Sequence, residues 1–242
     1  MHRIDIAAAM LRTSDDRTLA ANNAVEDAFD DGLDYLELRY SPWFIAKQTG
    51  LDPNDVVGAV DKGASLASVR TGLPIGLIPT VARDFGPESA NDQVRTILET
   101  RDLWCGIDLA GNEVGFPAQL FAPAFLRARE ARLHITVHAG EAAGPESVAA
   151  AIDYLGAERI GRGVRSAEDP HLLRRLMARG TTLEVYLTSN TQTQASNSLA
   201  NHQTHDLLKA GVSVTLNTDN PTTSSTRLVS PQNIAEQNPK HT

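Results

Sequence analysis

The sequence has a single cysteine and no long apolar run among its 242 residues. No stretch reaches the roughly 18 apolar residues that a membrane-spanning helix needs, so no membrane span is predicted. The first residues carry Arg3 and Asp5 among alanines and lack the apolar core of a signal peptide. Cys105 has no partner for an intrachain disulfide, which suits a reducing compartment. The expected location is therefore cytoplasmic.

Basic residues are also in the minority. Lysine and arginine number 22 against 30 aspartates and glutamates, which gives a net charge of −8. Such a chain repels phosphate groups, so neither nucleic acid nor a membrane surface is an expected partner. No patch in the sequence identifies a protein partner. The apolar fraction of 41% is enough for a sizeable core.

Short runs rich in Ile, Val, Leu and Thr alternate with amphipathic stretches. The predicted strands are Leu33–Tyr40, Pro74–Val81, Cys105–Leu109, Leu133–His138, Glu158–Ile160, Thr182–Leu187 and Val212–Asn217. The predicted helices are Thr13–Asp31 (with Ser14 and Asp15 as candidate caps), Asp55–Val69, Glu88–Leu103, Ala118–Ala131, Glu146–Leu155, Asp169–Ala178 and Leu199–Ala210. This alternation predicts an α/β fold with a parallel sheet whose strands are buried on both faces. Seven strands leave open a Rossmann-like sheet and a barrel that is one strand short of eight.

The domain organisation follows from composition. No Gly/Ser linker interrupts residues 1–220, which are expected to form one domain. Residues 221–242 are rich in Thr, Ser, Asn, Gln and Pro and poor in apolar residues. They are expected to form a loosely attached or disordered polar tail.

Polar residues gather where the predicted strands end. His138 and Glu141 follow one strand, Gly111 follows another, and Asp219 and Asn220 follow the last. In a barrel these ends converge on one face, where active sites are built. His138 and Asp219 could be metal ligands with Glu141 as a proton shuttle, but each could instead be an ordinary structural residue.

Other chemistries find less support. Ser189 lacks the glycines of a nucleophile elbow. Cys105 is expected to be a small core residue. The Gly-Arg-Gly at 161–163 lacks the spacing of a phosphate-binding loop.

Six motifs occur in order along the chain: Glu37–Pro42, Asp108–Glu113, His134–Ala142, Arg159–Gly161, Leu187–Asn190 and Asn217–Asp219. Together they resemble the adenosine deaminase family, especially its bacterial members. The resemblance runs from about Ala20 to Pro221.

This resemblance implies a TIM-type (β/α)₈ barrel that deaminates adenosine or deoxyadenosine hydrolytically to inosine in purine metabolism. It implies Zn²⁺ as the cofactor and a small purine nucleoside as the binding partner. By resemblance, His138 and Asp219 are zinc ligands, Glu141 protonates the purine ring, and the backbone of Gly111 contacts the purine. The chemistry is coherent, because zinc lowers the pKa of water and a carboxylate can relay protons.

The sequence departs from the family pattern at several points. It contains no His-x-His pair, which the family carries on its first strand, so two of four protein ligands are lacking. The expected barrel is therefore incomplete, without the first strand and the closing C-terminal helix. Arg162 replaces a histidine that orients the attacking hydroxide, and it cannot act as a base near neutral pH. Asn220 replaces an aspartate that contacts a purine ring nitrogen.

Three interpretations remain open at this point. The chain could be an active zinc adenosine deaminase, or a non-catalytic relative that serves as a purine-binding or interaction protein. It could also be a related hydrolase that acts on another substrate, such as free adenine. The departures favour a family member whose activity is impaired.

Overall fold

The computed structural model describes residues 2–187, 190 and 202–218. Its strands are β1 (Leu36–Tyr40), β2 (Ile75–Ala82), β3 (Gly106–Ala110), β4 (His134–Ala139), β5 (Arg159–Arg162), β6 (Thr182–Val185) and β7 (Val214–Leu216). Its α-helices are α1 (His2–Met10), α2 (Ser14–Asp30), α3 (Pro42–Thr49), α4 (Pro53–Thr71), α5 (Gly86–Glu99), α6 (Ala122–Glu130), α7 (Pro145–Ala150), α8 (Pro170–Arg179) and α10 (Thr204–Lys209).

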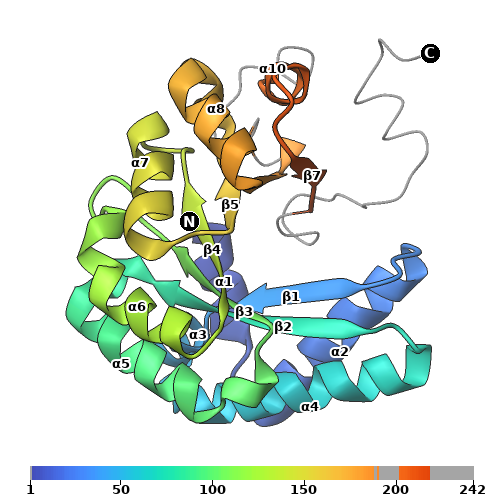
Figure 1. Cartoon of the computed structure of the whole chain (residues 1–242). Helices are drawn as coiled ribbons and strands as arrows, with labels where there is room; N and C mark the ends of the chain where they lie inside the picture. Colours follow the sequence, from blue (N-terminus) through green and yellow to red (C-terminus); the bar gives the residue numbers. More distant parts are fainter. Residues whose placement is uncertain (1, 188–189, 191–201, 219–242) are drawn as a thin grey trace.

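In this part of the chain the seven strands form one parallel sheet in sequence order. The sheet curls into part of a barrel, and the helices that connect the strands lie along its outer side (Figure 1). Parallel strands need such crossovers, because the chain must return to the same end of the sheet before the next strand begins. As a result the carboxyl ends of the strands gather at one edge.

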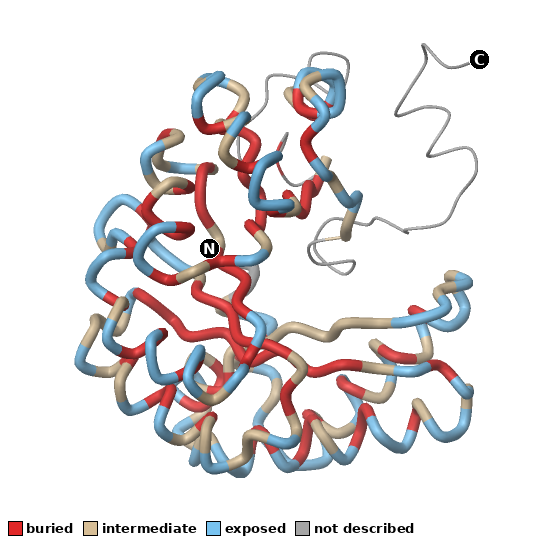
Figure 2. Tube along the Cα trace, viewed as in Figure 1, coloured by how far each residue is buried: buried red, intermediate tan, exposed pale blue. Residues whose placement is uncertain are grey.

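The apolar core lies between the sheet and the surrounding helices. Ile107 on β3, Ile135 on β4 and Phe125 on α6 are fully buried members of it. Strands β2 to β6 are mostly buried, whereas β1 is half-buried and β7 is partly exposed (Figure 2). The prediction of strands buried on both faces is therefore confirmed for the middle of the sheet. It is wrong for its two outer strands, each of which has one neighbouring strand in the described part of the chain.

The predicted elements are recovered with shifted boundaries, and two of the α-helices in the described ranges were not predicted. All seven predicted strands are present. Helix α2 is capped by Thr13, in a capping box with Asp16, rather than by Ser14 and Asp15. Helices α1 and α3 are additions, and α3 begins with the cap Ser41 and ends at Gly50.

Parts of two predictions fall outside the described residues. The predicted helix Leu199–Ala210 is described only from residue 202, and its helical part starts at Thr204. The predicted tail at 221–242 is not described. Among the helices that are described, none is long and apolar enough to cross a membrane.

Helices α2 and α4 cross closely at Gly63. A Cβ atom on Gly63 would lie 2.1 Å from the backbone oxygen of Thr18. The Thr18 hydroxyl donates a hydrogen bond to the carbonyl of Ala59 at 3.1 Å, one turn earlier on α4. The two helices therefore touch backbone to backbone, and a larger residue would force them apart.

We expect Gly63→Ala to lower the free energy of unfolding by about 1–3 kcal/mol, because the added methyl group overpacks this crossing. Gly58→Ala on the same helix is the matched control, since a Cβ there meets no atom within 4 Å. That control should be neutral or stabilising by up to about 1 kcal/mol, because alanine favours helix over glycine. Urea unfolding measures both, and equal effects of the two substitutions would refute the close crossing.

Candidate active site

The predicted site residues that are described lie at the carboxyl ends of three neighbouring strands. Gly111 follows β3, His138 is near the end of β4, Glu141 is in the loop after it, and Arg162 ends β5. Strands β4 and β5 pair in parallel, with His138 opposite Gly161. Gly111, His138 and Glu141 therefore lie at one edge of the sheet, as expected, and Arg162 joins them there, while the roles assigned to these residues stay predictions. Asp219 and Asn220 lie outside the described residues.

His138 is held by a buried carboxylate. Its Nδ1 atom lies 3.1 and 3.0 Å from the two carboxylate oxygens of Asp108 on β3. Burial by itself would raise the pKa of Asp108. The interactions of Asp108 with His138 and Arg39 outweigh burial and hold this pKa at about 2. The contact fixes the orientation of the imidazole and leaves Nε2 with no hydrogen-bond partner among the described residues.

This arrangement is typical of a metal-ligating histidine, whose second ring nitrogen is bound to a carboxylate. However, no group of three His, Cys, Asp or Glu side chains within the described ranges is placed to hold a metal ion. His138 is thus a suitable single ligand. The side chains of the described residues do not by themselves form a complete zinc site.

Glu141 and Arg162 form an ion pair at the same edge. The Arg162 guanidinium lies 3.3 Å from Oε1 of Glu141. It also lies 4.7 Å from the centre of the Tyr186 ring, within cation–π distance. Arg162 is buried and has a positive φ of 75°, a conformation that side-chain-bearing residues seldom adopt. Backbone and side-chain contacts together therefore direct this cation toward Glu141.

Gly111 occupies a position that no other residue fits without displacement. Its φ is 119°, and a Cβ atom there would lie 1.9 Å from a carboxylate oxygen of Asp84. Asp84 accepts the backbone N–H of Asn112 at 3.2 Å, which fixes the turn after β3. The backbone at Gly111 is exposed, so a planar ligand could approach it closely.

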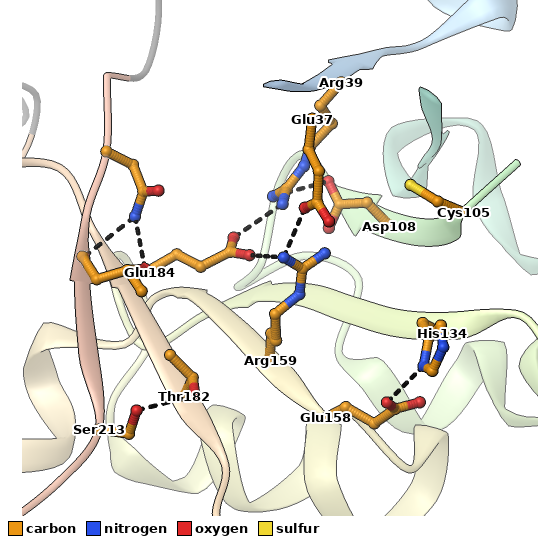
Figure 3. A network of polar contacts seen from close by, with 12 residues as sticks. Glu37, Arg39, Cys105, Asp108, His134, Glu158, Arg159, Thr182, Glu184 and Ser213 are labelled. Carbon is orange, nitrogen blue, oxygen red and sulfur yellow. Dashed lines mark hydrogen bonds and ion pairs between the residues drawn. The ribbon is translucent and has the colours of Figure 1, made fainter. Parts of the chain in front are cut away.

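An ionic network inside the curled sheet was not predicted from sequence. Arg39 on β1 donates to Glu184 on β6 at 2.8 Å and lies 3.8 Å from Asp108. Arg159 on β5 binds Glu37 at 2.6 Å and Glu184 at 3.3 Å. Figure 3 shows these five side chains, which come from β1, β3, β5 and β6, pointing toward one another. The sequence signal for this network was the presence of charged residues within otherwise apolar strands. A buried charge requires a partner, so such residues indicate ion pairs inside the sheet.

Tyr186 and Asn190 follow β6 and are hydrogen-bonded to each other. The Tyr186 hydroxyl donates to Glu184 at 3.3 Å, and burial raises the pKa of this tyrosine. The backbone N–H of Asn190 donates to the Tyr186 carbonyl at 2.8 Å, and the Asn190 side-chain oxygen accepts the Tyr186 N–H. The residues after β6 therefore fix the ring on which Arg162 lies.

We expect Asp108→Asn to flatten the acid-induced loss of stability. The folded pKa of about 2 lies below the roughly 3.9 of an unfolded aspartate, so the unfolded chain takes up the proton first as pH falls. The contribution of Asp108 is full above about pH 4 and is lost between about pH 4 and 2. Its size is on the order of 2 kcal/mol.

Urea unfolding between pH 2 and 6 measures this effect. The variant Asp92→Asn, at an exposed carboxylate that pairs with Arg95, is the control and should follow the wild-type curve closely. Parallel curves for wild type and Asp108→Asn would show that the contacts of Asp108 do not stabilise the fold.

Comparison with known proteins relates both the sequence and the fold of this chain to one family. The adenosine deaminase family model matches residues 1–242. An adenosine deaminase from Edwardsiella ictaluri is 44% identical over 221 residues, which are 91% of this chain and 66% of that protein. The chain thus spans slightly less than two thirds of the length of this relative.

Two solved structures share the fold. An adenine deaminase from Arthrobacter aurescens has a TM-score of 0.90 and 29% identity, and the match covers 98% of this chain and 71% of that one. An amidohydrolase from Burkholderia ambifaria with bound Zn has a TM-score of 0.82 and 27% identity, covering 88% and 60%. The seven strands in the described part of the chain form part of a (β/α)₈ barrel, and the chain belongs to the adenosine deaminase family.

Proposed function

We propose that this chain binds adenosine or deoxyadenosine at the carboxyl edge of β3 to β5, and that hydrolytic deamination to inosine is impaired in it. The observation that carries the proposal is the ion pair between Arg162 and Glu141, two residues that flank His138 at this edge. Membership of the adenosine deaminase family supports the substrate class.

The proposed roles of Gly111 and Glu141 follow from their place at this edge, and that of Asn220 follows from membership of the family. The exposed backbone of Gly111 contacts the purine, and Glu141 gives a proton to the purine ring. Asn220 supplies a neutral hydrogen bond to a ring nitrogen. Each role places a polar group of this chain against a flat, nitrogen-rich ligand.

We also propose that His138 and Asp219 are the zinc ligands of this chain. The contact between His138 and Asp108 supports the first, because it leaves Nε2 available as a ligand atom. The zinc-bound relative supports the metal. When bound, zinc supplies a water molecule of lowered pKa.

Arg162 is the main cause of impairment in this proposal. Its guanidinium binds Oε1 of Glu141, the carboxylate that this proposal assigns as the proton donor. Arginine also remains charged, so it cannot take a proton from water. Both steps that need proton movement are therefore opposed by one side chain.

We expect Arg162→His to increase inosine formation from adenosine at least tenfold in buffer with added zinc chloride. A positioned acid or base contributes about 10²–10⁴-fold to a rate, which gives room for such a gain. The matched control is Arg165→His, which makes the same replacement at a residue paired with exposed Glu168. A gain no larger than that of the control would contradict the role given to Arg162.

Free adenine is the second candidate substrate, because the adenine deaminase structure superposes on 98% of this chain. Calorimetric titration of the purified chain with adenosine and with adenine separates the two. We expect adenosine to bind more tightly. Tighter binding of adenine would favour the second candidate, and binding of neither would favour a non-catalytic interaction protein.

A further inference from the structure

The loop that carries Glu141 lies between the end of β4 and helix α7 and forms no regular structure of its own. Its backbone N–H groups therefore have no partner in a sheet or helix. Backbone donors that are partly buried need acceptors from elsewhere in the protein. The source of these acceptors decides how firmly Glu141 is held.

A single carboxylate from another loop supplies them. Oε1 of Glu113 accepts the N–H of Gly140, and Oε2 accepts those of Glu141, Ala142 and Ala143 at 3.3, 2.9 and 3.1 Å. Glu113 is 6% exposed and follows β3, so it reaches across to the next strand end. Hydrogen bonds to an ionised acceptor are stronger than neutral ones, and here one acceptor receives four.

A buried cation holds the other side of the same segment. Arg83 is fully buried and donates to the carbonyl of His138 at 2.7 Å. It also donates to the carbonyl of Phe116 at 3.1 Å, in the loop that carries Glu113. Arg83 thus donates to a carbonyl that precedes the Glu141 loop, and Glu113 accepts the N–H groups within that loop. The opposite charges of Arg83 and Glu113 attract each other.

We infer that Glu113 is a positioning residue that sets Glu141 against Arg162. The N–H of Glu141 itself is one of the four that Glu113 accepts, so the carboxylate fixes the backbone from which the Glu141 side chain starts. The meaning of this placement for deamination rests on the proposed function. The placement itself does not, and it can be measured without substrate or metal.

Glu113→Gln tests the inference in the full chain. Glutamine keeps one acceptor oxygen but turns the other into an NH₂ donor, which would face backbone N–H groups. We expect amide hydrogen exchange at residues 141–143 to become roughly tenfold faster or more. The matched control is Glu146→Gln, because exposed Glu146 accepts the neighbouring N–H of Gly144, and the N–H groups of residues 141–143 are bound by Glu113 instead and should be unchanged.

A second readout reports the position of Glu141 itself. The NMR signal of the Arg162 guanidinium should shift in Glu113→Gln in the same direction as in Glu141→Gln, and should stay in place in Glu146→Gln. A purely structural role for Glu113 would lower the melting temperature without this shift. An unchanged Arg162 signal, or unchanged exchange at 141–143, overturns the inference.

Glu113→Asp covers the case in which Glu113→Gln does not fold. Aspartate keeps both carboxylate oxygens and the charge, but its side chain is shorter by one methylene. We therefore expect a smaller increase in amide exchange at residues 141–143 and a smaller shift of the Arg162 signal. Absence of adenosine binding by the wild-type chain would refute the proposed function and leave these two measurements to decide the role of Glu113 alone.

Discussion

The buried carboxylate of Asp108 is the constraint on which the edge of the sheet depends. A charge removed from water must be matched by partners, and those of Asp108 come from different strands. It contacts Arg39 of β1, Thr80 of β2 and His138 of β4. Four strands are thus tied at one point inside the curve of the sheet.

The network extends across the interior from that point. Arg39 also binds Glu184 of β6, although β1 and β6 are not neighbours in the sheet. A flat sheet would keep these strands apart, so the ion pair is satisfied only when the sheet curls. Curvature and charge pairing therefore depend on each other, and the orientation of His138 is one result of both.

Much of the fold could be predicted from sequence because its parallel strands are apolar runs separated by helical crossovers. Helix α3 was missed although Ser41, Pro42 and Gly50 mark its start and its end in the sequence. The shared edge of His138, Glu141 and Arg162 was predictable, because strand ends converge. The partnership of Glu113 with residues 140–143 was not, because such contacts depend on how two loops meet in space.

The positive φ of Arg162 has a consequence for which residues this position can accept. Left-handed backbone disfavours β-branched side chains but is adopted more often by asparagine, aspartate and histidine. The residue that follows, Gly163, is also left-handed, so the bend is shared by two adjacent residues rather than imposed by the arginine alone. The backbone at the end of β5 therefore has a conformation that histidine adopts more often than most residues do. Replacing Arg162 with histidine would not require this backbone to change.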